Sequence, residues 1–375
     1  MAHACQAPIV KLTIFGLTLS SSWGNGHATP YRALLRALAK QGLTSIFYEK
    51  DVEYYAWRRD FTSCDYCELV LYSDWESVRR RALADVRESD VVIVGSFCPE
   101  GARINNEILG VSGPLRVFYD LDTPVTLSQL RQGSADYVRA DQIPAFDLYL
   151  SFTGGSILRQ LEEVWHARLA RPLYGCVDPE VHRRTNSRCE FQCDLSYMGT
   201  YSLDRQHKFE QLFLEPARRM PEARFVLAGS LYPKRWNLPP NMSRFDHVAP
   251  AKHPVLYSSS RATLNLTRDN MARSGYCPSG RFFEAAACGT PIISDWWEGL
   301  DHFFTPGEEI LVSHNAEQVI NALSSDEHAM ERLSTRARER TLDQYTGACR
   351  AHELLGYLEE AKLQPMPGDS LEVAS

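Results

Sequence analysis

The sequence SGRFFEAAACGTP, residues 279–291, predicts a helix that begins beside a glycine and packs closely on a sheet. Ser279 and Gly280 precede the helix, so the free N–H groups of its first turn can face a diphosphate that the backbone approaches closely. Arg281 in that turn has the wrong sign for the helix dipole, which favours a role toward an anion. Glu284, one turn later, can accept two hydrogen bonds from ribose hydroxyls. On local physics alone, an ordinary helix with a capping serine explains these residues equally well.

Short apolar segments alternate with helical segments on both sides of this stretch. Apolar runs without a polar face, such as residues 91–95, are typical of parallel strands that helices cover on both faces. We therefore expect an α/β protein built on Rossmann-like, doubly wound sheets. The expected strands are residues 9–19, 44–48, 91–95, 115–119 and 148–152 in the first half and residues 195–199, 224–229, 262–266, 291–295 and 310–312 in the second.

The alternation breaks once, at residues 172–179 and the polar segment that follows them. A chain of 375 residues is long enough for two domains of about 150–200 residues each, and we place their boundary at this break. The predicted units are an N-terminal domain over residues 1–178, a C-terminal domain over residues 179–345, and a helix with a frayed tail over residues 346–375.

Charge and cysteine content limit the classes of protein to consider. The net charge of −7 disfavours a nucleic-acid-binding protein, because the phosphate backbone requires a basic surface. The first ten residues do not have the pattern of a signal peptide, and no stretch approaches the roughly 18 apolar residues of a membrane span. Ten cysteines without secretory features are typical of reduced thiols, so the expected location is the cytoplasm.

Two cysteine pairs have the spacing of half a zinc site, Cys64 with Cys67 and Cys189 with Cys193. Neither pair has a second pair or a histidine at ligand spacing, so we expect free thiols and no metal.

The N-terminal half has two candidate catalytic residues. Gly24-Asn25-Gly26-His27 follows the first strand, and Thr29 stands where a dinucleotide-binding loop has its third glycine. His27 is a candidate base for an acceptor hydroxyl, with a polar residue at a helix N-terminus as the equal alternative. Asp122 ends a strand, where such sheets place functional groups, although an N-cap role is slightly favoured.

The segment 279–291 resembles the donor-binding helix of group-1 glycosyltransferases of the GT-B fold, in which a Glu before "ALACGTPVI" holds the donor ribose. With SDWWEGL at residues 294–300 and PGEEI at residues 306–310, the chain more closely resembles the CgeB-like, spore-maturation-type glycosyltransferases. YGCVDP at residues 174–179 is similar to the linker that enters their C-terminal domain, and MGTY at residues 198–201 to that domain's first strand and loop. The resemblance implies the GT-B fold, two facing Rossmann-like domains with a cleft between them.

The resemblance also implies a donor-nucleotide site on the C-terminal domain. Glu284 would bind ribose, the first helical turn would bind the diphosphate, and a loop near residues 246–248 would contact the base. The implied donor-binding residues are Gly199, Tyr201, Arg205, His247, Val248, Arg268, Ser279, Gly280, Arg281 and Glu284. Many retaining members carry a second Glu eight residues before the ribose Glu, but here that position is Tyr276, so inverting and retaining transfer both stay open.

The predicted function is transfer of a hexosyl-type group from a nucleotide diphosphate sugar, such as a UDP-sugar, to a hydroxyl of a small molecule or glycan. No metal or cofactor besides the donor is expected, because arginines and helix N–H groups can neutralise the departing diphosphate. A GT-B sugar-nucleotide epimerase and a non-catalytic nucleotide-sugar-binding protein are the alternatives. An NAD(P) oxidoreductase is disfavoured by the missing third glycine.

Overall fold

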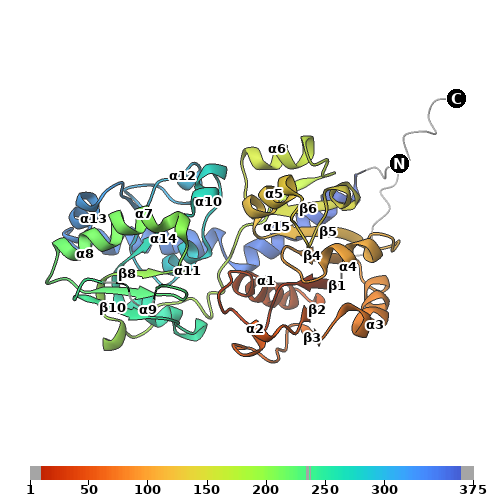
Figure 1. Ribbon diagram of the computed structural model, residues 1–375, viewed down its shortest axis with the longest axis horizontal. Helices are drawn as coiled ribbons and strands as arrows, with labels where there is room; N and C mark the ends of the chain where they lie inside the picture. The colour runs from red at the N-terminus through yellow and green to blue at the C-terminus, as the bar shows by residue number, and fades with distance from the viewer. Residues whose placement is uncertain (1–9, 234–235, 237, 365–375) are drawn as a thin grey trace.

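The computed structural model describes residues 10–233, 236 and 238–364, which form two units, each built on one parallel sheet (Figure 1). In the N-terminal unit the strand order is β3-β2-β1-β4-β5-β6-β7, and in the C-terminal unit it is β10-β9-β8-β11-β12-β13. The first sheet comprises β1 (Lys11–Gly16), β2 (Thr44–Lys50), β3 (Glu68–Tyr72), β4 (Val91–Gly95), β5 (Leu115–Asp120), β6 (Leu148–Ser151) and β7 (Ala170–Pro172). The second comprises β8 (Cys193–Met198), β9 (Phe225–Ala228), β10 (Met242–Phe245), β11 (Ser260–Asn265), β12 (Ile292–Ser294) and β13 (Leu311–Val312).

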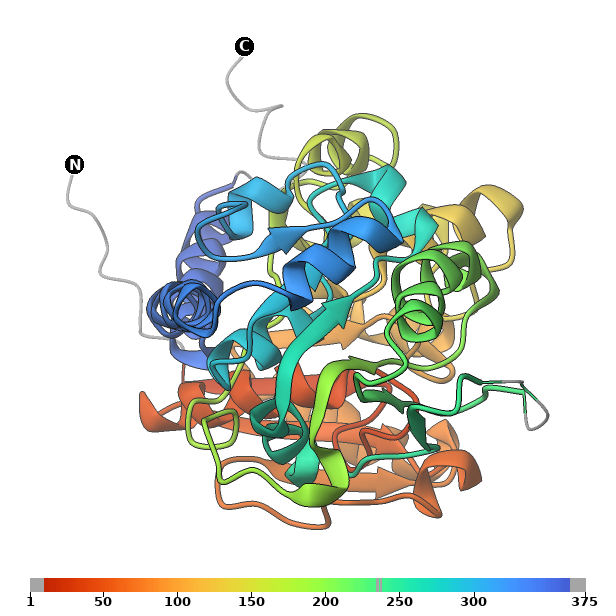
Figure 2. The same cartoon turned by 90° about the vertical axis from the view of Figure 1, so that its left-hand side faces the viewer.

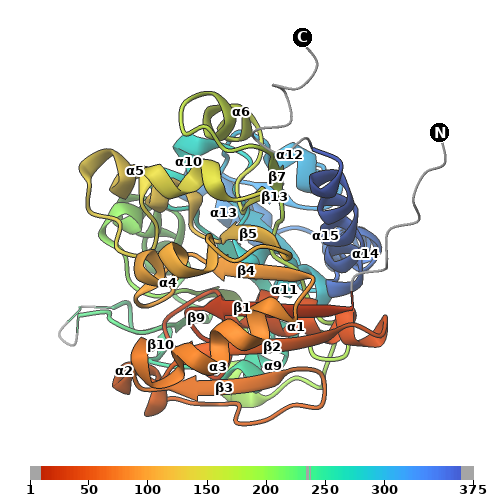
Figure 3. The ribbon, with the colours of Figure 1, turned by 90° about the vertical axis from the view of Figure 1, so that its right-hand side faces the viewer.

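Helices cover both faces of each sheet, so β4, a central strand over residues 91–95, is apolar and buried along its whole length. Figures 2 and 3 show these layers from the two ends of the molecule. The helices of the first unit are α1 (Ala28–Lys40), α2 (Glu53–Ala56), α3 (Trp75–Arg87), α4 (Gly101–Ile108), α5 (Thr123–Gln132) and α6 (Ser156–Glu163). Those that follow are α7 (Gln206–Phe209), α8 (Glu215–Arg219), α9 (His253–Ser259), α10 (Asp269–Ser274), α11 (Gly280–Ala287), α12 (Leu300–Phe303), α13 (Ala316–Leu323), α14 (Glu327–Gln344) and α15 (Gly347–Lys362). Short 3-10 turns cover Ala140–Ala145, Cys189–Phe191, Leu203–Arg205 and Pro250–Lys252, and a π-helical turn, Glu210–Leu214, joins α7 to α8.

The fold class expected from the sequence is confirmed: both sheets are parallel and doubly wound. Several boundaries differ. The first strand ends at Gly16 rather than at residue 19, and the helix expected over residues 209–220 is divided by the π-helical turn. Ile9, the expected first residue of that strand, and the expected frayed tail beyond Gln364 lie outside the described residues.

The strand order reverses at one point in each sheet, between β1 and β4 in the first and between β8 and β11 in the second. Loops that leave neighbouring strands in opposite directions open a crevice at such a point, and ligands of doubly wound sheets bind there. The glycine-rich loop before α1 and the loop after β8 both lie at these points. The topology alone therefore directs one loop cluster of each unit toward the space between the sheets.

The chain passes from one unit to the other twice, once near Val177 and once near Tyr345. Backbone hydrogen bonds join the two connecting segments. Val177 N–H donates to the Tyr345 carbonyl at 2.9 Å, and Gly347 N–H donates to the Val177 carbonyl at 2.9 Å. The predicted boundary at residue 178 falls in the connection between β7 and β8. After the second crossing, α15 packs against α1, so the last described helix returns to the N-terminal unit (Figure 1).

None of the described helices combines the length and the apolar character needed to cross a membrane.

Candidate active site

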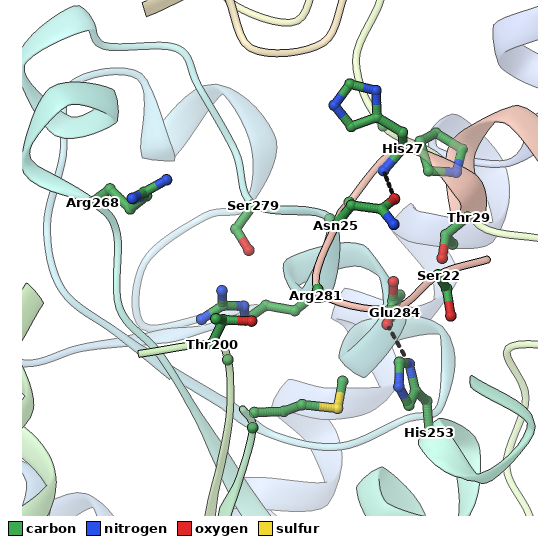
Figure 4. Close-up of a pocket in the computed structure, with 18 of the residues that line it drawn as sticks. Ser22, Asn25, His27, Thr29, Thr200, His253, Arg268, Ser279, Arg281 and Glu284 are labelled. Atoms are coloured by element: carbon green, nitrogen blue, oxygen red, sulfur yellow. Dashed lines mark hydrogen bonds and ion pairs between the residues drawn. The ribbon is translucent and has the colours of Figure 1, made fainter. Parts of the chain in front are cut away.

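A cavity of about 370 Å³ lies between the two units, lined by loops of both sheets (Figure 4). It brings together eleven of the residues predicted from sequence: His27, Asp122, Gly199, Arg205, His247, Val248, Arg268, Ser279, Gly280, Arg281 and Glu284. Tyr201 is the exception. Its ring packs against Tyr232 and Trp236, at 5.5 and 6.3 Å between centroids, and it does not line the cavity. Tyr201 therefore packs against aromatic residues of its own unit.

Glu284 is a buried carboxylate with an unused hydrogen-bonding oxygen. Its side chain points into the cavity from α11 (Figure 4). Within the described part of the chain Oε1 accepts no hydrogen bond, while Oε2 is buried and faces Nδ1 of His253 at 3.4 Å. Burial disfavours the charge, but the hydrogen bond from His253 and the fields of His182, His253 and Arg281 outweigh it and lower the pKa of Glu284 to about 2. A buried ionised carboxylate with a free oxygen is suited to accept hydroxyl donors from a ligand.

His253, at the start of α9, fixes this carboxylate. Its Nε2 lies 3.1 Å from the Val248 carbonyl, an atom that only accepts, so Nε2 carries a proton. The other ring nitrogen, Nδ1, lies 3.4 Å from Glu284 Oε2. The sequence reasoning missed His253, because a histidine before a helix-starting proline carries no pattern that points to a carboxylate distant in the chain.

Two guanidinium groups lie beside this carboxylate in the cavity wall. Arg205 Nη2 donates to the Thr200 carbonyl, and Arg281 Nη1 lies 3.3 Å from the Tyr197 hydroxyl. Within the described part of the chain neither has a carboxylate in salt-bridge contact. Burial lowers the pKa of Arg205, and the charge of Arg281 lowers it further. Arg205 is buried and Arg281 is partly buried, and the two cations repel each other, although the charge of Glu284 also acts on Arg281. Two such cations attract an anionic ligand.

The N-terminus of α11 is open toward the same space. Ser279 occupies the N-cap position, but its side chain makes no capping hydrogen bond, so the capping-serine alternative is wrong. A Cβ added to Gly280 would have no atom within 4 Å, so the backbone there borders open space. Uncapped N–H groups at a helix N-terminus favour an anion.

Gly199 is required by close packing. A Cβ there would lie 2.9 Å from the Tyr197 hydroxyl and 3.0 Å from Nη1 of Arg281. A Cβ on Gly229 would lie 2.0 Å from the Gly199 carbonyl oxygen, so the loops after β8 and β9 also touch through backbone. Because Gly199 and Gly229 have no Cβ, the loops after β8 and β9 can pack against each other and against the guanidinium group of Arg281.

The loop after β10 holds the residues predicted to contact the base. His247 and Val248 line the cavity, and the His247 ring packs edge-on against Trp23 of the N-terminal unit at 4.4 Å between centroids. Burial, and the fields of His253 and Arg58, lower the pKa of His247. This contact joins the two units at one side of the cavity.

His27 and Asp122 form a hydrogen-bonded pair on the N-terminal wall. His27 Nε2 lies 2.7 Å from Asp122 Oδ2, which also accepts from Ser96 Oγ at 3.2 Å. Burial raises the pKa of Asp122, but the charge and hydrogen bond of His27 outweigh it and hold this pKa below its ordinary value. An ionised carboxylate only accepts, so Nε2 carries a proton, while Nδ1 is a buried atom with no hydrogen-bond partner in the described part of the chain. Asp122 occupies the N-cap position of α5 without capping it, so the N-cap role favoured from sequence is wrong.

Arg268 lines the cavity from the loop after β11, with Nη2 3.0 Å from Ser202 Oγ and Nε 3.5 Å from Asp204 Oδ2. Its charge also lowers the pKa of Asp122 across the cavity. Arg268 thus lines the cavity and acts electrostatically on the histidine–aspartate pair.

Tyr276 stands where a sugar-binding Glu occurs in many retaining relatives, but it does not line the cavity. Its ring lies between two glycines: a Cβ on Gly155 would be 2.5 Å from the ring and one on Gly299 would be 2.6 Å from it. Its carbonyl accepts from Gly154 N–H at 3.0 Å, and its φ of 44° is in the left-handed region. Tyr276 is a contact between the two units, not a sugar ligand.

Across residues 10–233, 236 and 238–364 no group of three or more His, Cys, Asp or Glu side chains is placed to hold a metal. Cys64 Sγ lies 3.1 Å from the Cys67 carbonyl, and Cys189 is exposed while Cys193 is buried.

The architecture is the GT-B fold of glycosyltransferases, as three solved structures show. Sucrose-phosphate synthase from Thermosynechococcus elongatus has a TM-score of 0.66 at 15% identity, over 94% of this chain and 98% of that one. HepE from Anabaena, in complex with UDP and glucose, has a TM-score of 0.65 at 10% identity, over 94% and 100%. An α-glucosyltransferase in complex with UDP has a TM-score of 0.70 at 15% identity, over 93% and 99%.

At the level of sequence, residues 205–356 match the family described as "Glycosyl transferase-like". That segment contains Arg205, Arg281 and Glu284, and it ends within α15. No curated protein matches the chain.

Proposed function

We propose that this protein transfers a glycosyl group from a nucleoside diphosphate sugar to an acceptor hydroxyl. The observation that carries the proposal is the anion-binding corner: Arg205 and Arg281, neither in a salt bridge within the described residues, beside the uncapped N-terminus of α11. One turn further along that helix, Glu284 offers a free oxygen where the ribose of a nucleotide would follow its diphosphate. The match of residues 205–356 to a glycosyltransferase family supports the same reading.

The two walls have separate roles in this reaction. On the C-terminal wall, Arg205, Arg281 and the helix N–H groups stabilise the charge that develops on the departing diphosphate. On the N-terminal wall, Nδ1 of His27 accepts the proton of the acceptor hydroxyl while Asp122 stabilises the resulting imidazolium. The hydroxyl oxygen forms a bond to the anomeric carbon of the donor sugar, and the bond from that carbon to the diphosphate breaks.

A thermal-shift screen tests the proposal. UDP-, dTDP- and GDP-sugars are added to the full chain, because a ligand at 100 times its Kd stabilises the folded state by about 2.7 kcal/mol. We expect at least one nucleoside diphosphate sugar to raise the melting temperature, with UDP-sugars the first candidates. If no nucleotide or nucleotide sugar shifts it, the site assignment is wrong.

We further propose that transfer needs no metal, because the arginines and helix N–H groups already neutralise the diphosphate. Transfer measured with excess EDTA should equal transfer without it, and a loss of activity that Mg²⁺ or Mn²⁺ restores would refute this part.

Finer features of the proposal rest on sequence. The motifs at residues 294–300 and 306–310 support placement among CgeB-like glycosyltransferases, and the ten cysteines support a cytoplasmic location. The net charge of −7 supports a non-nucleic-acid acceptor. The α-glucosyltransferase among the similar structures has also been solved with UDP-glucose and DNA, so a mobility-shift measurement with duplex DNA is the direct check.

Two alternatives use the same donor pocket. An epimerase would convert the nucleotide sugar with no acceptor present, and a non-catalytic binding protein would bind it unchanged. The histidine–aspartate pair with a free Nδ1 favours transfer over mere binding, because a binding protein has no need of a poised base.

A further inference from the structure

Helix α2 and the residue after it present two aromatic rings to solvent. Tyr54 is 54% exposed and Trp57 is 78% exposed. Trp57 continues the helical conformation, so the two positions, three residues apart, share one face of the turn. Trp57 Nε1 donates to Glu53 Oε1 at 3.2 Å, which holds the indole in one orientation. Tyr54 also packs edge-on against Tyr55, at 5.1 Å between ring centroids. We call the two exposed rings of Tyr54 and Trp57 the platform.

The platform lies beside the N-terminal wall of the cavity. Figure 1 shows α2 on the side of the N-terminal unit that is nearest the C-terminal unit. The Tyr54 hydroxyl would lie 2.7 Å from a Cβ on Gly24, which lines the cavity, so the helix packs directly on the glycine-rich loop. Burial, and then the neighbouring Tyr54 and the charges of Glu49 and Asp122, raise the pKa of Tyr55 to about 12. The charge of Asp122, which lines the cavity, therefore acts on Tyr55 of α2.

The residues around the platform have almost no net charge, which favours a neutral ligand over a charged one. Residues 49–60 contain three Lys or Arg and four Asp or Glu, so the segment has almost no net charge. Lys50 pairs with Glu100 at 2.8 Å, and Arg59 pairs with Asp51 at 2.7 Å. Single-stranded nucleic acids also stack on aromatic rings, but they need a continuous positive track that this segment lacks. A neutral ring with apolar C–H faces and hydroxyl edges fits both the rings and the charge balance.

We propose that Tyr54 and Trp57 form an acceptor platform on which a neutral carbohydrate ring stacks, so that a hydroxyl of the same glycan reaches His27. This inference rests on the proposed function and specifies its acceptor as a neutral glycan. The platform binds and orients the acceptor, while the donor corner on the C-terminal unit is unaffected by it.

Glycan binding without a donor is the first test. The full chain, labelled, is applied to an array of neutral glycans, with Trp57→Ala and Tyr54→Ala beside the wild type. Trp296→Ala is the matched control, because Trp296 is also exposed, at 47%, and lies outside the cavity lining. We expect binding by the wild type and Trp296→Ala that falls by about tenfold in each platform variant, the loss that removal of one stacking ring causes. Absence of glycan binding, or equal binding by all four proteins, overturns the proposal.

Kinetics with a retained glycan separate this inference from the proposed function. In Trp57→Ala the acceptor KM should rise by about tenfold while kcat and the affinity for UDP stay near the wild-type values, and Trp57→Phe should restore most of the loss. An unchanged acceptor KM in Trp57→Ala overturns the platform even if transfer is found. Failure of the wild type to bind UDP overturns the proposed function, whatever the array shows. Binding of an oligothymidylate instead of glycans, or dimerisation that Trp57→Ala abolishes, assigns the rings to another partner and also overturns the platform.

Discussion

The two walls of the cavity differ in how their charged side chains are paired. The C-terminal wall contains Arg205, Arg281 and Glu284, and the N-terminal wall contains His27 and Asp122. On the C-terminal wall the guanidinium groups of Arg205 and Arg281 make no salt bridge within the described residues, and Oε1 of Glu284 accepts no hydrogen bond there. On the N-terminal wall the charge of Asp122 is already paired with His27, and only one imidazole nitrogen is free. An unpaired wall gains stability when an anion binds, whereas a paired wall is prepared to move a proton. The difference supports the proposal that the C-terminal wall binds the donor diphosphate and that the N-terminal wall accepts the proton of the acceptor hydroxyl.

His27→Ala should give the largest effect, because it removes the proposed base and leaves the C-terminal wall intact. We expect kcat for transfer to fall by about 10²- to 10⁴-fold. The affinity for UDP, measured by calorimetry on the same preparation, should be unchanged. Equal transfer rates in wild type and variant would show that the histidine is not the base.

Asp122→Asn should give a smaller loss in kcat, about 10- to 100-fold, because a hydrogen bond to a charged group contributes about 1.5–3 kcal/mol. The amide oxygen can still orient the imidazole but cannot stabilise its positive charge. Steady-state kinetics with saturating donor is the measurement. A larger donor KM with an unchanged kcat would assign Asp122 to donor binding instead.

Asp120→Asn tests the buried network behind the histidine–aspartate pair. Burial raises the pKa of Asp120 from 3.8 to about 6, although hydrogen bonds from Tyr149 and Thr126 oppose this. The folded protein therefore keeps a proton that the unfolded chain releases between pH 4 and 6, and wild-type stability falls as pH rises through this window. Relative to Asp120→Asn, the wild type should lose up to about 2–3 kcal/mol of unfolding free energy from pH 4 to pH 7. Urea unfolding at several pH values measures this, and a constant difference between the two proteins would contradict it.

Arg205→Met should change the stability of the empty protein and its affinity for UDP in opposite directions. Removing one of two unpaired guanidiniums should stabilise the empty protein by about 1–2 kcal/mol, because a buried charge without a partner is costly. The same variant should bind UDP more weakly. Paired thermal-shift and calorimetric measurements check both, and a variant that is less stable when empty would show that Arg205 is structural.

The helical part of the C-terminal wall, residues 279–284, could be predicted from sequence, because these residues lie within one segment and follow helical spacing. Glu284 and Arg281 are one turn apart on α11, and the central apolar strands were recognisable for the same local reason. Strands β3, β7 and β10 were not predicted; β10 has four residues, none of them buried. The first is an edge strand with an alternating, partly exposed pattern, and the second has only three residues.

Contacts between elements distant in the chain were not predictable from local patterns. His253 meets Glu284 across 31 positions, as the residue numbers show, and Asp122 meets His27 across 95. Tyr276 was compared with a sugar-binding Glu by its position in a motif, but only the fold shows that Gly155 of the other unit takes up its ring. Sequence spacing fixes neighbours on one element. The two histidine–carboxylate pairs depend on how elements pack within one unit, and the Tyr276 contact depends on how the two units face each other.

Calorimetric titration of UDP into the wild type, Glu284→Ala and Arg281→Ala tests the central claim most directly. The wild type should bind UDP with one site per chain, and each variant should lose about 10- to 100-fold in affinity, because each loses charge-assisted hydrogen bonds. Unchanged affinity in both variants, or no nucleotide binding by the wild type, would contradict the assignment of the C-terminal wall as the donor site.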